Sequence, residues 1–187
     1  MNNDGVINTL DRTVIGDFNP KYTYGFRTSF NLSRFTLSLT FDGVGGKQIL
    51  NANLAQLTDP FYSYATNVIR DAYYKAWTPE NRSNKYIAMN AYGNGERGFV
   101  TDRYIEDASY LRLSTASLSY RFPISKKSKV VKGITAGASC GNALMFTKYS
   151  GWSPMVNSFG HSMTKIGIDI GSYPYARSYS FDLTFTF

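Results

Sequence analysis

The first eleven residues carry a pattern that matches part of a calcium-binding loop. Side chains with oxygen atoms recur at near-alternating positions, at Asn2, Asp4, Asn8 and Asp11. Calcium takes ligands of this kind from a short loop with a glycine at its sharp turn, the place that Gly5 would occupy. The pattern predicts a weak site that lacks its first ligand position. An Asx-rich surface turn is the competing interpretation, because these residues also favour turns without a metal.

A second candidate chemistry is the stacking of aromatic side chains on sugar rings. Aromatic residues make up 16% of the sequence, which suits aromatic girdles or carbohydrate-binding surfaces better than a compact enzyme. Trp77, Tyr149 and Trp152 lie in two long segments, 47–107 and 147–175, and are the candidate substrate-binding residues. Alternatively, such residues pack the small cores of their own loops.

The sequence contains no catalytic constellation. Cys140 and His161 are each the only residue of their type, so neither a disulfide within the chain nor a His/Cys metal site is expected. No paired carboxylates in a pocket-like context suggest acid–base catalysis. We therefore expect no enzymatic activity, and no cofactor apart from the structural calcium ion considered above.

The formal net charge is +7, and the basic residues are densest at Lys126, Lys127, Lys129 and Lys132. This cluster lies in a segment predicted to be a turn. A nucleic-acid surface would require more basic residues on one face, with aromatic residues between them. We interpret the cluster as a solvated turn and expect no nucleic-acid partner.

The framework that carries these segments is predicted to be a set of β-strands, and the clearest strand is 177–187. Tyr179, Phe181, Leu183, Phe185 and Phe187 alternate with small polar residues and Asp182. A strict period of two predicts a strand with one apolar and one wet face. Its length and aromatic apolar face favour a strand of a transmembrane β-barrel.

Four further strands are predicted from the same alternation, at 22–32, 35–42, 109–122 and about 133–146. The first two form a hairpin with a tight turn at Ser33 and Arg34. In the strand at 109–122 the apolar phase switches near Ser114, which predicts a β-bulge within 114–116. Cys140 is then a small residue on the apolar face.

The two long segments between these strands are predicted to be loops. Thr58, Asp59 and Pro60 resemble a helix start, so a short helix is expected from there to about Lys75. The sequence is therefore all-β, and it predicts an antiparallel transmembrane barrel segment with long extracellular loops. A soluble, aromatic-rich carbohydrate-binding β-sandwich remains the alternative, because its strands would alternate in the same way.

Several motifs, each weak alone, occur together in one order: Asp-Gly-Val-Ile-x-x-x-Asp-Arg at 4–12, Val-Ile-Gly-x-x-x-Pro at 14–20, Tyr-x-Tyr-Gly-Phe at 22–26, Ile-Glu-Asp-x-Ser-Tyr-Leu-Arg-Leu at 105–113, Leu-Ser-Tyr-Arg-Phe-Pro at 118–123, Asn-Ala-Leu at 142–144, Tyr-Ser-Gly-Trp at 149–152 and Tyr-Pro-x-Ala-Arg-Ser at 173–178. With the closing aromatic strand, they resemble SusC/RagA-type TonB-linked outer-membrane proteins. One departure is the acidic-Pro-acidic triplet of that family, which is replaced by Ser153, Pro154 and Met155.

The resemblance implies a transporter in the outer membrane of a Gram-negative bacterium, with a barrel of about 22 strands. It implies import of glycans or peptides with a SusD-type surface lipoprotein that closes the mouth of the barrel. Residues 1–187 resemble only the C-terminal part of that barrel, about its last five strands. The plug domain and the TonB box, through which the TonB complex supplies energy, are expected outside this chain.

Five strands with ordinary twist cannot close on themselves. Their two outer edges would leave backbone donors and acceptors unpaired, which is costly in lipid. We therefore expect the remainder of the barrel to pair with both edges, outer-membrane lipid to cover the apolar face, and the chain alone to be insoluble without detergent. Arg27, Asp42, Arg112 and Asp182 are expected to face a wet lumen.

Overall fold

The computed structural model describes residues 5, 9–59, 67–89, 101–124, 130–160 and 165–187. The chain divides into two compact units, each made of three separate segments. The sheet unit consists of Pro20–Gly46, Ser109–Lys148 and Pro174–Phe187; the loop unit consists of Met1–Asn19, Lys47–Ala108 and Tyr149–Tyr173.

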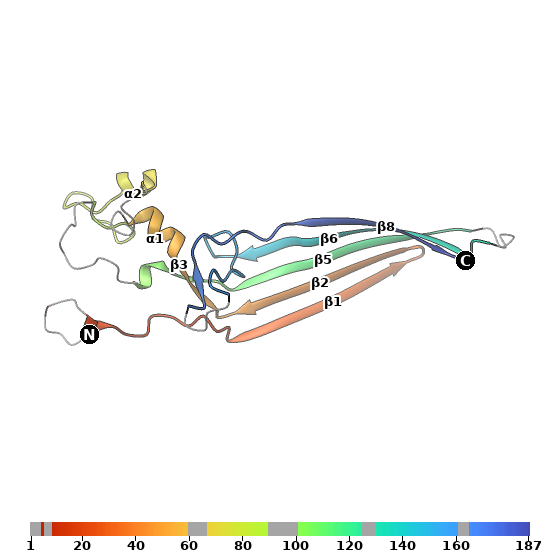
Figure 1. The fold of residues 1–187 in the computed structure, drawn as a ribbon, viewed down its shortest axis with the longest axis horizontal. Coiled ribbons are helices and arrows are strands. Elements are labelled where there is room, and N and C mark those ends of the chain that lie inside the picture. Colours follow the sequence, from red (N-terminus) through yellow and green to blue (C-terminus); the bar gives the residue numbers. More distant parts are fainter. Residues whose placement is uncertain (1–4, 6–8, 60–66, 90–100, 125–129, 161–164) are drawn as a thin grey trace. The chain divides into compact units, whose positions relative to one another are not determined.

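The sheet unit is one antiparallel sheet of five strands in the order β1-β2-β5-β6-β8, as Figure 1 shows. The strand bounds are Tyr22–Leu32 for β1, Phe35–Gly45 for β2, Tyr110–Phe122 for β5, Gly133–Thr147 for β6 and Ser178–Thr186 for β8. These are the five strands predicted from alternation, with ends that differ by up to three residues. The antiparallel β-sheet is therefore confirmed.

The register of the strands places their alternating apolar residues on one face of this sheet. Phe26 pairs with Phe41, Leu37 with Leu118, and Ala138 with Phe181. Directly opposed residues share a face, and residues two apart on a strand share it too. From the alternation we predicted a common face for the odd-numbered residues of 35–41 and 179–187; this is confirmed up to Phe185, and Phe187 lies just beyond β8. We call this the apolar face and the opposite one the polar face.

The predicted bulge lies at Ser114. The pairing of β5 with β6 shifts between Leu113 and Thr115, and the pairing of β2 with β5 shifts at the same level. The Ser114 hydroxyl donates to the Thr40 carbonyl oxygen at 3.0 Å. The extra residue keeps the apolar side chains on the same face before and after the bulge. The apolar positions in the sequence therefore change from odd to even numbers.

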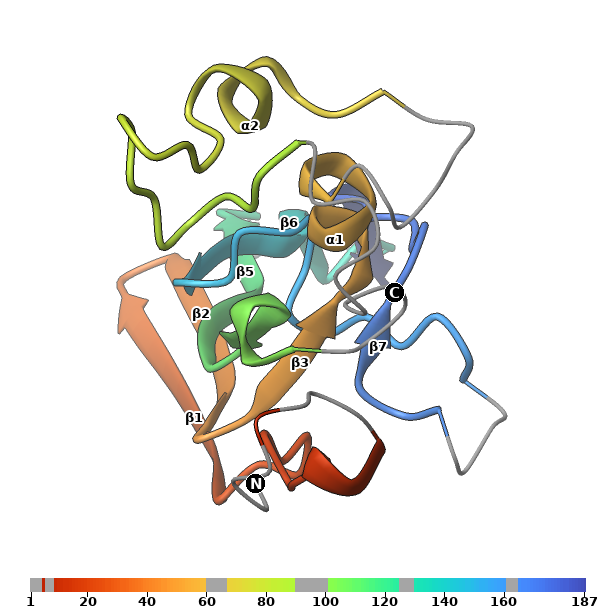
Figure 2. The same ribbon diagram turned by 90° about the vertical axis from the view of Figure 1, so that its left-hand side faces the viewer.

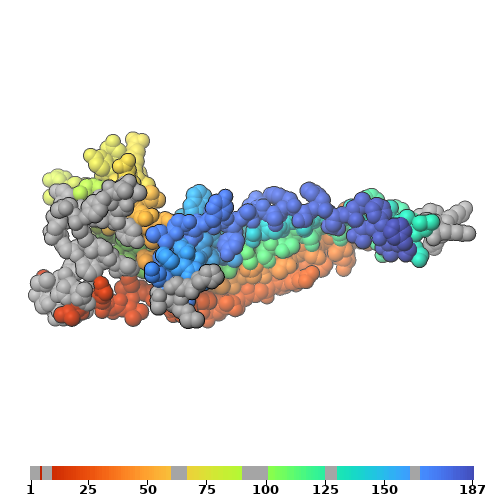
Figure 3. Space-filling view, in the orientation of Figure 1, coloured from red at the N-terminus to blue at the C-terminus, as the bar shows by residue number. Residues whose placement is uncertain are grey.

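The sheet has two open edges within the described residues. β1 pairs only with β2, and β8 pairs only with β6; Figure 3 shows β1 in orange and β8 in blue along the two margins. Near one end of β2, Gly43 and Gly45 have no side chains, and the rings of Tyr24 and Tyr22 cover them. A Cβ atom at either glycine would collide with those rings, so the glycines make room for the aromatic side chains.

The loop unit contains a second, small sheet in the order β4-β3-β7; Figure 2 labels β3 and β7 of this sheet, together with α1. β3 pairs antiparallel with β4 and parallel with β7. The helices and strands of the loop unit are η1 Thr9–Asp11, β3 Gln48–Asn51, α1 Ala52–Thr58, α2 Arg70–Tyr74, η2 Asp102–Tyr104, β4 Ile105–Asp107 and β7 Ile168–Asp169. We predicted 47–107 and 147–175 as loops with one short helix, and we did not predict β3, β4 and β7, because strands of two to four residues are too short to show alternation.

The helix predicted from Thr58 to about Lys75 is not one continuous helix, because Thr58 is already the last residue of α1 and residues 67–69 are not helical. α2 falls inside the predicted span, and residues 60–66 of that span lie outside the described residues. Thr58 ends α1, and its hydroxyl donates back to the Leu54 carbonyl oxygen at 2.7 Å. The N-cap of α1 is Asn51, whose side chain accepts from the Leu54 N–H at 3.0 Å, the bond that favours Asn at this position. Asp59 is extended, in keeping with the steric restriction on a residue that precedes proline.

The core of the loop unit is a small cluster of Ile49, Ala108 and Tyr149. Ala52 and Ala55 of α1 are also buried, so the helix packs through small side chains. Within the described ranges, no helix has the length and apolar character needed to cross a membrane.

Candidate functional site

The polar face of the sheet unit carries the charged side chains that we expected to face a wet lumen. Arg27 pairs with Thr40, Asp42 with Arg112, and Asp182 with Gly137. Small hydroxyl side chains fill much of the rest of this face, and two cross-strand pairs are hydrogen-bonded, Ser29 with Ser38 at 3.1 Å and Thr36 with Asn31 at 2.8 Å. Such a face suits contact with water.

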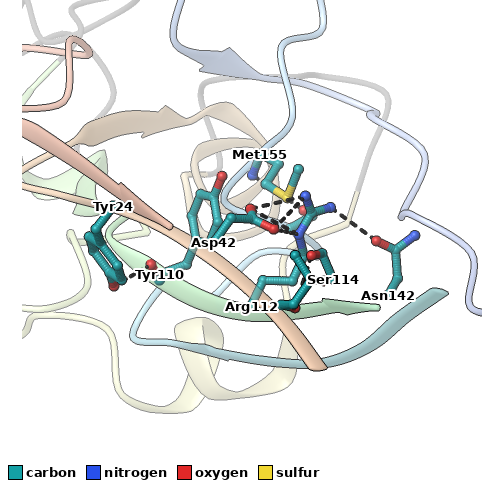
Figure 4. A network of polar contacts seen from close by, with 9 residues as sticks. Tyr24, Asp42, Tyr110, Arg112, Ser114, Asn142 and Met155 are labelled. Carbon is teal, nitrogen blue, oxygen red and sulfur yellow. Dashed lines mark hydrogen bonds and ion pairs between the residues drawn. The ribbon is translucent and has the colours of Figure 1, made fainter. Parts of the chain in front are cut away.

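Arg112 is the centre of a polar network on this face (Figure 4). Its Nε and Nη2 atoms lie 3.0–3.2 Å from both carboxylate oxygens of Asp42, and its Nη1 donates to the Asn142 side-chain oxygen at 3.0 Å. The side chains of Arg112 and Asp42 are 18% and 33% exposed. This two-point pairing of planar groups fixes the guanidinium direction as well as its position.

The network ties three strands together beside the bulge. Asp42 belongs to β2, Arg112 to β5 and Asn142 to β6. Asn142 has a positive φ of 52°, a conformation that Asn adopts more readily than most residues. Its side-chain nitrogen donates to the Ala176 carbonyl oxygen at 2.9 Å, in the segment that leads into β8. The network therefore holds the register where the ladder is irregular.

We expect Asp42→Asn to destabilise the full-length protein by about 1 kcal/mol, because the bidentate ion pair loses its charge and Arg112 keeps only neutral acceptors. Thermal unfolding in detergent measures this loss. Asp182→Asn is the matched control, since Asp182 lies on the same face but outside this network. Equal stability of the two variants would show that the ion pair adds nothing.

A second polar network lies inside the loop unit and centres on Glu106. Its Oε1 accepts from the Asn51 side-chain nitrogen at 3.0 Å and from the Ser150 hydroxyl at 2.7 Å. Its Oε2 accepts from the Ser150 N–H at 2.8 Å. One carboxylate thereby joins β3, β4 and the start of the segment after β6.

Tyr149 is buried beside this network. Its hydroxyl donates to Asp169 Oδ2 at 2.6 Å, and the other oxygen, Oδ1, is buried without a hydrogen-bond partner in the described structure. Burial raises the pKa of Tyr149, and the hydrogen bond to Asp169 raises it further, because an adjacent carboxylate disfavours a phenolate. The pair is therefore a structural contact that closes β7 against the core.

The three candidate substrate-binding residues have different surroundings. Trp152 is 76% exposed and Trp77 is 42% exposed, so both have ring surface available to a ligand. Tyr149 is only 6% exposed, and its ring belongs to the core cluster. The structure thus does not bring the three together on one open surface.

The predicted calcium ligands Asn2, Asp4 and Asn8 lie outside the described residues. Asp11 is described and lies in η1. Among the residues that the structure describes, no group of three or more His, Cys, Asp or Glu side chains is arranged to hold a metal ion. His161 and the lysines at 126, 127 and 129 also lie outside the described residues.

Cys140 lies on the apolar face, opposite Ala116 and Tyr179. It lines a shallow groove of about 230 Å³, together with Ala138 and Phe181 among other residues. The groove exists because the side chains in the middle of β5 and β6 are small. This agrees with the prediction of a small residue on that face.

Sequence reasoning missed Glu106, Asn51 and Asp169 as polar residues of the loop unit. Glu106 stood within the motif at 105–113, which was the only signal for it. Asn51 and Asp169 had no signal, because their contacts depend on the pairing of β3 with β7.

No protein-family model matches the chain. TonB-dependent receptor P3 of Formosa agariphila is 34% identical over 192 residues, covering the whole chain and 18% of that protein. TonB-dependent receptor SusC of Bacteroides thetaiotaomicron is 29% identical over 129 residues, covering 68% of the chain and 12% of that protein.

The fold of the chain is similar to part of two solved structures. The structure described as the RagAB peptide transporter matches with a TM-score of 0.76 and 21% identity, over 93% of this chain and 18% of that one. The RagAB peptide importer in its closed-closed state matches with a TM-score of 0.75 and 22% identity. The chain spans about one fifth of the length of the first relatives that it matches.

Proposed function

Since the chain is a segment of a SusC/RagA-type TonB-dependent receptor, we propose that its five long strands form part of the transmembrane β-barrel wall of an outer-membrane importer. The observation that carries this proposal is the two-faced sheet with open edges. One face is aromatic and aliphatic, the other is small, polar and charged, and both outer strands have unpaired edges among the described residues. A segment of a barrel wall needs an apolar face for lipid, a polar face for the interior, and edges that pair with neighbouring strands.

The orientation follows from the two faces. The apolar face contacts outer-membrane lipid, and the polar face, with the Arg112 network, lines the wet interior. β1 and β8 pair with the remainder of the barrel, which satisfies their backbone groups. The chain thereby forms about the last five strands of a barrel of about 22.

The whole receptor, in this proposal, imports glycans or peptides and performs no enzymatic step. It works with a SusD-type surface lipoprotein, and the TonB complex supplies energy through an N-terminal part outside this chain. The loop unit belongs to the extracellular side, where such barrels carry their long loops. The name of one structural neighbour, a peptide transporter, supports a peptide as one of the two cargo classes.

A soluble carbohydrate-binding sandwich is less well supported. It requires a second sheet packed on the apolar face. Phe26, Phe30, Phe181 and Leu183 on that face are 62%, 58%, 84% and 58% exposed. Such exposure over both edge strands suits lipid contact.

We test the proposal with the full-length receptor, tagged and expressed from its own locus. It should fractionate with the outer membrane, and its deletion should stop uptake of labelled oligosaccharides or peptides. Loss of TonB should stop the same uptake while leaving the receptor in the outer membrane. A receptor recovered as a monodisperse soluble protein without detergent would contradict the proposal.

A further inference from the structure

The surface around α2 combines exposed aromatic rings with basic side chains. Ala72 and Ala76 are buried at 0% and 6% exposure and face the interior of the loop unit. Tyr73, Tyr74 and Trp77 remain 62%, 70% and 42% exposed. We call Arg70, Tyr73, Tyr74 and Trp77 the aromatic–basic patch.

Contacts within the patch join three of its side chains, Arg70, Tyr73 and Tyr74. The rings of Tyr73 and Tyr74 meet edge to face at 89°, with their centroids 5.3 Å apart. The Arg70 guanidinium carbon lies 5.5 Å from the centroid of the Tyr74 ring, a cation–π distance. An arginine that is already oriented loses less freedom when it binds a carboxylate or a sulfate.

The backbone beyond the helix is also fixed. The Thr78 N–H donates to the Asn81 carbonyl oxygen at 3.0 Å, and the Asn81 side-chain nitrogen donates to the Ala76 carbonyl oxygen at 3.1 Å. These bonds form a closed turn immediately after Trp77. The indole therefore projects from a braced backbone.

The charge of this region is positive. Residues 67–89 contain four basic side chains and two acidic ones. Asp71 is paired with Lys75 at 2.8 Å, and the hydrogen bond from Lys75 lowers the pKa of Asp71. Arg70 takes part in neither of the ion pairs found among the described residues. Its guanidinium therefore stays available beside the rings.

We propose that the aromatic–basic patch binds an acidic oligosaccharide, with a sugar ring stacked on Tyr74 or Trp77 and its carboxylate or sulfate bound by Arg70. Aromatic faces suit the C–H surfaces of sugar rings, and the arginine fork suits a planar or tetrahedral anion. This inference rests on the proposed function and names the class of glycan that the receptor takes. A neutral glycan would leave the guanidinium unused.

The test uses the full-length receptor in detergent and isothermal titration with two matched probes. One is an oligogalacturonate of about six residues, and the other is its methyl ester, which keeps the sugar backbone but removes the charge. We expect the acidic probe to bind about fivefold or more tightly than the ester at low salt, and to lose that advantage at high salt. Hexaglutamate tests for an acidic peptide.

Variants assign the binding to the patch. Arg70→Gln should weaken binding of the acidic probe about fivefold and leave the ester unchanged, whereas Tyr74→Ala should weaken both about tenfold. Tyr173→Ala and Arg34→Gln, at exposed positions elsewhere, are the matched controls. Circular dichroism confirms that each variant is folded.

The inference is overturned if acid and ester bind equally, if hexaglutamate binds as well as the acidic sugar, or if the patch variants match the controls. It is also overturned if another part of the receptor protects Tyr74 from solvent before any probe is added. Outer-membrane location and TonB-dependent uptake are measured in parallel. If both persist while the titrations fail, only the inference is wrong and the proposed function stands.

Discussion

Ala138→Arg is expected to destabilise the full-length receptor by about 2–4 kcal/mol, the cost of an arginine on the lipid face near the bilayer midplane. Ala138 pairs with Phe181 on the apolar face, in the middle of β6. Its neighbour in sequence, Ser139, pairs with Ser180 and Ser117 on the polar face. The same charge at Ser139 would meet water and small hydroxyl groups, so it should be tolerated.

The two variants form a matched pair, since the same side chain is introduced one residue apart at the same depth. The amount of folded receptor in the outer membrane and its unfolding in denaturant in lipid vesicles measure the difference. Loss of assembly for Ala138→Arg with near-normal Ser139→Arg is the expected result. Equal tolerance of both variants, or the reverse order, would refute the assignment of the apolar face to lipid.

Glu106→Gln is expected to destabilise the loop unit by about 1–3 kcal/mol, although the side chains have the same shape. Glu106 accepts three hydrogen bonds through its two oxygens, two of them from Ser150 and one from Asn51. A glutamine has only one oxygen, so its amide nitrogen must face a donor. Asn51 is 2% exposed, so its side-chain nitrogen has no easy access to water as a replacement.

Hydrogen exchange in the full-length receptor measures this effect at the network. The amides of residues 48–51 and of Ser150 should exchange faster in Glu106→Gln, while the amides of β5 and β6 keep their protection. Glu80→Gln, at an exposed position of the same unit, is the control and should change neither region. Unchanged exchange at Ser150 would mean that the three bonds do not stabilise the unit.

The strands of the main sheet and their two faces could be predicted from the sequence. Alternation with a period of two assigned the odd-numbered residues of 35–41 and 179–187 to a shared face, which the pairing confirms up to Phe185, and the phase change at Ser114 located the bulge. These predictions succeeded because the side-chain direction of a long strand depends only on local backbone geometry. The motifs, spread over the whole chain, were also sufficient to identify the family.

The candidate site was predicted only in part. The placement of Asp42 and Arg112 on the polar face followed from their phase, but their pairing did not, since they lie 70 residues apart. That contact depends on the order of the strands in the sheet and on the shift at the bulge. Neither quantity is encoded in the period of a single strand.

The arrangement of the loop unit depends on contacts between distant segments and could not be predicted from the sequence. Tyr149 was a candidate for sugar stacking, yet the pairing of β3 with β7 brings Asp169 to its hydroxyl and buries the ring. α1 itself was not predicted; Asn51 caps it, and the same side chain contacts Glu106 from 55 residues away. Short elements carry too few residues for a period, so their positions follow from buried hydrogen bonds between segments that are distant in the chain.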